Sequence, residues 1–230
     1  MSSPVQQRPP DDEPPSSGVE PAPRRGLRLM IYDRSCRGRR GLPGLSHAWW
    51  AGAQLYRGLR RLDAYRGVDS WEEALEFLAD FRSDHPLAEV QYWGHGKWGG
   101  ARVRQQLLDR AALDRRHPLH ARLAAVRDRM QPGGQALWWF RTCETLGARP
   151  GQRFATELAE FLDARIAGHT YIIGHVQSGL HTLAPGERPT WPEDEGLLEG
   201  SPEEPRRAHW SRMRAPNTIT CLRGTIPAGY

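Results

Sequence analysis

Hydrophobic and polar positions along the chain follow two periods, one typical of strands and the other of helices. Apolar runs of strand length occur at residues 27–33 (LRLMIYD), 87–93 (LAEVQYW), 135–143 (QALWWFRTC) and 169–174 (HTYIIG). The third run is nearly continuous, which is typical of a strand covered on both faces. The sequence therefore predicts four core strands, and residues 218–226 (TITCLRGTI) are a candidate for a last one.

Between these runs, apolar residues recur at intervals of three and four, the spacing of amphipathic helices. Ser70 and Glu73 form a capping box at the start of SWEEALEFLADFRSD. The other predicted helices, the first of them capped by Ser46, cover residues 46–62, 115–130 and 152–164. Alternating strands and helices predict a three-layer α/β/α sandwich with a mainly parallel central sheet and a site at the carboxyl ends of its strands.

Two segments differ from this pattern in composition. Residues 1–25 hold seven prolines and almost no large apolar side chains, so they cannot offset their ordering entropy by burial, and we predict a disordered tail. Residues 26–230 are then a single domain. Within it, residues 182–216 are rich in Pro, Glu, Gly and Arg, which predicts a long surface insertion.

Charge and cysteine content narrow the function classes. The formal net charge is +5, but the basic residues are almost all arginine and are interleaved with acids along the chain, so we expect no nucleic-acid partner. The three cysteines are an odd, sparse set, which favours a reducing compartment over a disulfide framework. No export signal and no apolar run of membrane-spanning length are present, so a cytoplasmic protein without a membrane partner is expected.

Two predicted core strands end at residues that can form a catalytic pair. His95 follows the run 87–93 and lies between Gly94 and Gly96, and Cys143 ends the run 135–143. An imidazole that takes the proton of a thiol makes the cysteine a nucleophile at neutral pH. Taken alone, His95 also fits a structural histidine in a glycine turn, and Cys143 a small buried core residue.

The spacing between the two residues, 143 − 95 = 48, is close to the roughly 50 residues that separate the histidine and cysteine of caspases. With GHGKWGG and LWWFRTCETLGARPGQRFATELAEFLDARIAG, residues 27–180 resemble the caspase-like (clan CD) cysteine peptidases. They are most similar to bacterial CHAT-type and related caspase-like domains of mostly unassigned function. The resemblance implies that His95 is the base, that Cys143 is the nucleophile and that the Gly96 backbone N–H is part of an oxyanion hole.

The residues around the cysteine depart from the patterns of known members. Cys143 is preceded by Thr142 and followed by Glu144, so neither the caspase pentapeptide nor the metacaspase Asp-Cys pair is present, and substrate preference does not transfer. A carboxylate beside the thiol also raises the pKa of the thiol. Glu144, Asp33 at the end of the first strand and His175 are candidates for binding substrate or orienting the pair. Asp33 fits a turn cap equally well.

The remaining candidates point to ordinary structural roles. His117 and His120 lack a nearby acid or cysteine ligand, so no metal is expected, and Cys36 and Cys221 are expected to be plain free thiols. Two functions stay open. The first is a cysteine endopeptidase that acts on a protein or peptide substrate without a cofactor. The second is an inactive caspase-like binding or scaffold module in a bacterial multi-protein system, with a partner protein encoded nearby.

Overall fold

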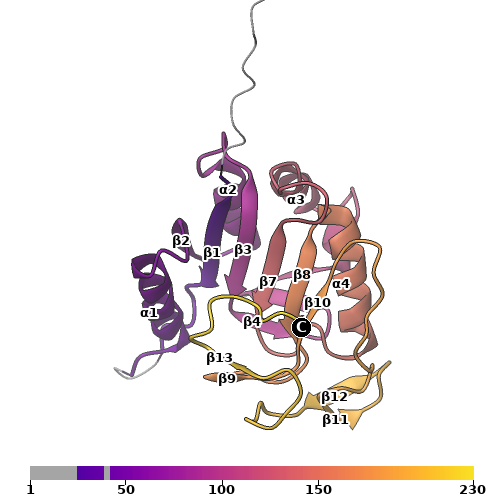
Figure 1. Ribbon diagram of the computed structural model, residues 1–230. Helices are drawn as coiled ribbons and strands as arrows, with labels where there is room; N and C mark the ends of the chain where they lie inside the picture. Colours follow the sequence, from indigo (N-terminus) through magenta and orange to yellow (C-terminus); the bar gives the residue numbers. More distant parts are fainter. Residues whose placement is uncertain (1–24, 39–41) are drawn as a thin grey trace, which may run out of the picture.

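The computed structural model describes residues 25–38 and 42–230, so the predicted tail, apart from Arg25, lies outside the described residues. A six-stranded sheet forms the centre of the fold, with the strand order β10-β8-β7-β3-β1-β2 (Figure 1). All neighbouring strands are parallel except β10, which runs antiparallel to β8. The strands are β1 (Leu27–Asp33), β2 (Ala64–Val68), β3 (Leu87–Trp93), β7 (Leu137–Arg141), β8 (Arg165–His169) and β10 (Leu180–Leu183). The predicted α/β class with a mainly parallel sheet is confirmed.

Alternate residues of the strands point to two faces that are covered differently (Figure 1). The larger core cluster joins one sheet face to α2, α3 and α4. On the other face, Met30 and Trp93 pack against α1, while Trp139 and Leu180 pack against the segment 219–230. This arrangement is compatible with the predicted three layers. The helices are α1 (Leu45–Gly58), α2 (Trp71–Asp80), α3 (His120–Arg127) and α4 (Ala148–Leu162), with a 3₁₀ turn, η1, at Arg110–Leu113.

Helix starts follow the sequence signals in part. The Ser70 hydroxyl accepts a hydrogen bond from the Glu73 backbone N–H, as the capping box predicts. Ser46, however, is not the cap of α1, because Gly44 takes that position. The Ser46 hydroxyl instead donates to the carbonyl of Cys36 at 2.8 Å, so this serine fixes the β1–α1 loop.

Three predicted elements differ from those observed. The helix expected at residues 115–130 is limited to α3, because residues 114–119, which include Pro118, form turns. The strand expected at residues 169–174 is β8, displaced to Arg165–His169, and residues 170–175 form a loop beyond the sheet. The last strand, expected at residues 218–226, has only two residues and does not join the central sheet.

Three small sheets surround the carboxyl ends of the central strands (Figure 1). Directly after β3 comes a three-stranded antiparallel sheet that was not predicted from the sequence, and the other two small sheets are two-stranded. The predicted surface insertion at residues 182–216 contains one of these, the hairpin β11/β12. The strands concerned are β4 (His95–Lys97), β5 (Gly100–Val103) and β6 (Gln106–Asp109), then β9 (Val176–Gln177) with β13 (Ile219–Thr220), and β11 (Leu197–Gly200) with β12 (Pro205–Ala208).

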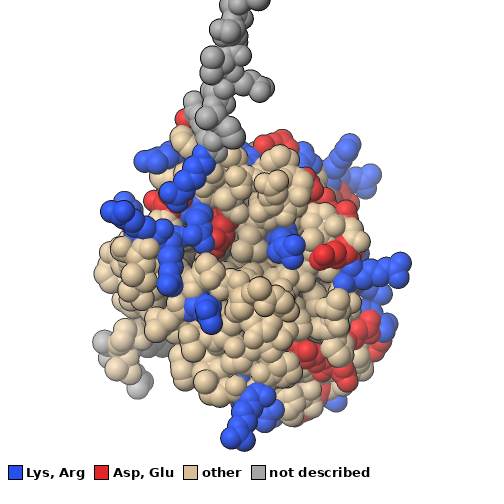
Figure 2. Space-filling view, in the orientation of Figure 1, with Lys and Arg blue, Asp and Glu red and all other residues tan. Residues whose placement is uncertain are grey.

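The surface of the face in view mixes the two signs of charge. Figure 2 shows Lys and Arg side chains interspersed with Asp and Glu around its rim, whereas most of its middle carries neither. Among the helices that the structure describes, none has the length and apolar character needed to span a membrane.

Candidate active site at the ends of β3 and β7

The two strands that lead to His95 and Cys143 are neighbours in the sheet. β3 and β7 run parallel, and the last residue of each, Trp93 and Arg141, are partners in the register. The chain therefore leaves the same edge of the sheet toward His95 from one strand and toward Cys143 from the next. This edge is where open α/β sheets place their binding sites.

The segment that carries His95 docks on the loop that carries Cys143. The backbone N–H of Trp98 donates to the Glu144 carbonyl at 3.0 Å, and that of Gly99 donates to the Thr145 carbonyl at 2.8 Å. Gly96 lies so close to this loop that an added Cβ would sit 2.0 Å from the Thr145 hydroxyl oxygen. A side chain at position 96 would push the two segments apart, so this glycine is needed for the docking itself.

Cys143 is partly buried against the loop that follows β8. The backbone N–H of Ile173 donates to Sγ of Cys143 at 3.4 Å, and the same sulfur lies 3.8 Å from the Ile173 carbonyl oxygen. Burial raises the pKa of the Cys143 thiol, the Ile173 N–H lowers it, and the charge of Glu144 raises it further. The thiol is therefore protonated at neutral pH unless a base removes its proton.

The partner of His95 in this structure is Cys36. The Sγ atom of Cys36 lies 3.1 Å from Nε2 of the exposed His95 ring, and the Trp49 ring meets the imidazole edge to face with centroids 5.7 Å apart. Among the residues that the structure describes, no hydrogen bond joins His95 to Cys143. Cys36 was expected to be a plain free thiol, and no motif or spacing marks it, because the contact depends on the path of the β1–α1 loop.

Asp33 shapes this loop. Its Oδ1 accepts hydrogen bonds from the backbone N–H and the hydroxyl of Ser35, at 2.8 and 2.6 Å, and its Oδ2 lies 3.9 Å from Sγ of Cys36. Burial, followed by the charge of Asp33, raises the pKa of the Cys36 thiol. Asp33 makes no hydrogen bond to His95 within the described ranges, so it acts on the imidazole through Cys36.

Glu144 has an unusual environment beside Cys143. The residue is 8 % exposed, and its Oε2 is buried without a hydrogen-bond partner. Burial raises the pKa of this carboxyl, while the nearby Lys97 lowers it. The backbone of Glu144 is left-handed with φ 53°, and Trp98 and Ala148 close by also have positive φ. Such strain in residues other than glycine is concentrated at functional sites.

His175, the remaining sequence candidate, lies in the loop after β8. Its side chain is exposed, and its carbonyl accepts a hydrogen bond from the Cys221 backbone N–H at 2.8 Å. The loop thus places His175 at the same end of the sheet as Cys143. Within the described part of the chain, no group of three or more His, Cys, Asp or Glu side chains could hold a metal ion.

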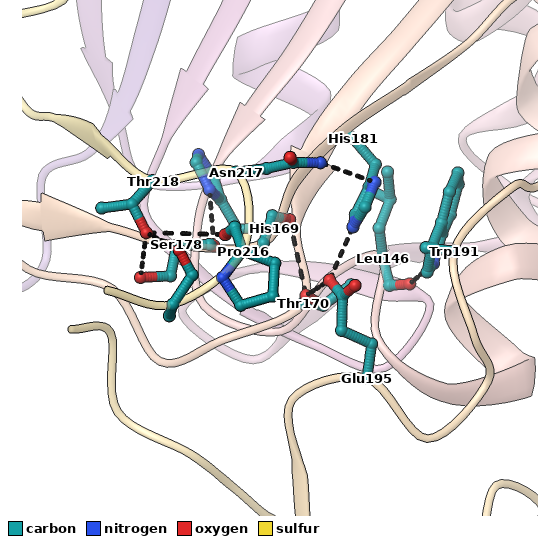
Figure 3. Close-up of polar contacts among 12 residues, drawn as sticks. Leu146, His169, Thr170, Ser178, His181, Trp191, Glu195, Pro216, Asn217 and Thr218 are labelled. Atoms are coloured by element: carbon teal, nitrogen blue, oxygen red, sulfur yellow. Dashed lines mark hydrogen bonds and ion pairs between the residues drawn. The ribbon is translucent and has the colours of Figure 1, made fainter. Parts of the chain in front are cut away.

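A buried polar network fixes the rim next to this loop (Figure 3). The His181 Nε2 lies 2.6 Å from Oε1 of Glu195, and the Thr170 hydroxyl donates to the same oxygen at 2.8 Å. The Trp191 ring stacks on His181 with centroids 4.7 Å apart. These contacts attach the segment before β11 to β10 and to the first residue of the loop that contacts Cys143.

Arg141, two residues before Cys143, is a second feature that was not predicted from the sequence. The residue is 3 % exposed, and its guanidinium carbon lies 4.6 Å from the ring centroid of Trp93 and 4.5 Å from that of Trp139. It donates hydrogen bonds to oxygens of Tyr56, Gln177, Cys221 and Arg223. A charge in the continuous apolar run LWWFR was the available signal, because buried arginines occur only where partners satisfy them.

The chain matches no protein-family model, no curated protein and no solved structure.

Proposed function

We propose that this chain is a cysteine endopeptidase of the caspase-like type, with Cys143 as nucleophile and His95 as base. The observation that carries the proposal is the docking of the β4 segment on the Cys143 loop through the backbone bonds of Trp98 and Gly99. These bonds hold a thiol and an imidazole on adjacent strand ends, at the edge of the sheet where substrates bind.

In the proposed reaction, His95 takes the proton of Cys143 and the thiolate attacks the carbonyl carbon of a peptide bond. The Gly96 and Cys143 backbone N–H groups stabilise the oxyanion. Collapse of this intermediate breaks the C–N bond as His95 protonates the leaving amine, and water then hydrolyses the thioester to release the acid and the thiol. Side chains and backbone groups of this chain, together with water, carry out each step, so the proposal includes no cofactor.

Glu144 directly follows Cys143 and is our candidate for binding the substrate, once its buried Oε2 is uncovered. Its buried oxygen without a partner can accept a hydrogen bond. Asp33, by contrast, already uses one oxygen to hold Ser35. We therefore propose that Glu144 accepts a hydrogen bond from a donor group of the substrate, such as a basic side chain. We propose that His175, which is exposed in the loop after β8, contacts the substrate from that loop.

The proposed setting is the cytoplasm, which agrees with three cysteines that are all free. The proposed substrate is a protein or peptide, and the proposed partner is another protein of a multi-protein bacterial system. Mixed charge on the face in Figure 2 fits a protein partner better than a nucleic acid.

One observation favours the second function, a caspase-like binding or scaffold module without turnover. His95 is hydrogen-bonded to Cys36 rather than to Cys143, and burial keeps the Cys143 thiol protonated. In a scaffold, the same edge of the sheet would hold a partner peptide without cleaving it.

Labelling and cleavage measured together separate the two functions. We expect a peptide-based electrophile to label the wild type at Cys143, and the wild type to cleave a peptide library that Cys143→Ala leaves intact. Cys221→Ala is the matched control, because it removes another partly exposed free thiol of the same chain and leaves Cys143 in place. Cys143 that is labelled no faster than Cys221, with no cleavage of any peptide, would contradict the peptidase and support the scaffold.

A further inference from the structure

We propose that Cys36 is a positioning residue for His95: its thiol donates to Nε2, keeps the imidazole proton on Nδ1 and so restrains the base that Cys143 needs. The part of this inference that concerns Cys143 rests on the proposed function. The part that concerns the tautomer of His95 does not.

The direction of the bond follows from the two groups. A thiol has one hydrogen to donate, and a neutral imidazole has one nitrogen that accepts and one that donates. The 3.1 Å separation of Sγ and Nε2 is within hydrogen-bonding distance. Sulfur is a weak acceptor whereas a neutral imidazole nitrogen is a good one, and Nε2 is closer to Sγ of Cys36 than the other acceptor, Oδ2 of Asp33, at 3.9 Å. We therefore take Cys36 as the donor and Nε2 as the acceptor, which agrees with the raised pKa of the thiol.

The pair is held from both sides. Asp33 fixes the turn at Ser35, and the carbonyl of Cys36 accepts hydrogen bonds from the backbone N–H and the hydroxyl of Ser46, at 3.1 and 2.8 Å. On the other side, Trp49 packs its ring against the imidazole. The hydrogen bonds around Cys36 restrain its loop, and the Trp49 ring restrains the imidazole. The contact between Cys36 and His95 therefore has little freedom to move.

The consequence for the base is direct. When Nε2 accepts a hydrogen bond from the Cys36 thiol, its lone pair is occupied and Nδ1 carries the imidazole hydrogen, so His95 has no free lone pair to receive the proton of Cys143. Catalysis then requires the imidazole to release Cys36. Removal of the Cys36 donor frees Nε2 and activates Cys143, whereas a serine at position 36 keeps a donor in the same place.

The tautomer is measured directly by ¹⁵N NMR of the His95 imidazole at about pH 8, where free histidine is neutral. We expect the Nδ1–H form in the wild type, a shift toward the Nε2–H form in Cys36→Ala, and a return to the wild-type spectrum in Cys36→Ser. The control is Cys221→Ala, which leaves His95 untouched. An unchanged His95 spectrum in Cys36→Ala, or the same change in Cys36→Ser, would overturn the inference.

The rate at which iodoacetamide alkylates Cys143, followed by mass spectrometry, tests the restraint. We expect a rise of about three- to tenfold in Cys36→Ala, in the range below full general-base assistance, and no rise in Cys36→Ser. An equal rate in all three proteins would overturn the restraint. Absence of peptide cleavage combined with the expected NMR and alkylation patterns would instead reject the peptidase and leave the role of Cys36 standing.

Discussion

The guanidinium of Arg141 donates a 2.7 Å hydrogen bond to the hydroxyl of Tyr56 and thereby joins the end of β7 to α1. The same guanidinium bonds the carbonyls of Cys221 and Arg223. One buried side chain thus links the strand that leads to Cys143, a helix on one sheet face and the segment 219–223.

Replacement of this arginine should loosen all three elements. For Arg141→Met we expect a loss of about 2–4 kcal/mol in the free energy of unfolding, because the buried carbonyls lose charge-assisted partners. Urea unfolding measures the loss, and hydrogen exchange should show faster opening of residues 219–223. The matched control is Arg165→Met, at an exposed arginine in β8. Equal stability of the two variants would mean that Arg141 is not the link.

The charge of Glu144 opposes ionisation of Cys143. Burial is the main cause of the raised pKa of the thiol, and Glu144 adds to it, so Glu144→Gln should lower the pKa of Cys143. We expect alkylation of Cys143 at about pH 7 to become roughly two- to fivefold faster, in proportion to the thiolate fraction. Glu199→Gln, in the exposed hairpin β11/β12, serves as the control. A slower reaction in Glu144→Gln would show that the carboxylate assists the thiol.

His169 should make the fold sensitive to acid. Burial, followed by the charge of Arg141, lowers the pKa of His169 to about 3, whereas an unfolded histidine titrates near about 6.5. Between these values the unfolded state binds the proton more tightly, so stability falls as pH decreases from about 6.5 toward about 3, by about 1.4 kcal/mol per pH unit.

The variant His169→Gln removes this titration and keeps a donor for the Ser178 carbonyl, which lies 3.1 Å from Nδ1 of His169. Urea unfolding at several pH values between about 7 and about 4 should show a pH slope smaller than that of the wild type by about that amount. Identical slopes would indicate that His169 becomes protonated in the folded protein without cost.

The contact between His181 and Glu195 should stabilise the attachment of the segment before β11 to β10. Both side chains are largely buried, at 10 % and 12 % exposure, so removal of one partner leaves the other without its bond. We expect His181→Ala to cost about 2–4 kcal/mol and to expose the segment that follows Trp191 to proteases. The double variant with Glu195→Gln should cost less than the sum of the single changes. Additive losses in this cycle would mean that the two residues act independently.

The sequence predicts the elements whose signals are local. The strands at Leu27–Asp33 and Leu87–Trp93 have the predicted bounds, and α2 begins with the predicted cap. β2 was missed because AYRGV is a short edge strand with an arginine and a glycine in it. The strand at β8 was misplaced because the apolar pair Ile172 and Ile173 belongs to the loop beside Cys143 and not to the sheet.

The candidate site, too, can be predicted from the sequence only in part. The neighbouring ends of β3 and β7 follow from the order of the apolar runs in a parallel sheet. The partner of His95 does not, because Cys36 reaches the imidazole through a loop whose shape depends on Asp33 and Ser46. A contact between a loop residue and a strand residue that are 59 positions apart leaves no periodic pattern in the sequence.

Arg141 and its partners in the segment 219–223 are far apart along the chain, so they are synthesised at different times. Cys221 follows Arg141 by 80 residues, so β7 emerges from the ribosome long before the carbonyls that satisfy the guanidinium. Until then the arginine must stay hydrated, and the sheet face beneath residues 219–223 remains open to water. In the proposed peptidase, Cys143 therefore follows a strand end whose arginine gains its full set of partners only after residues 219–223 have been added.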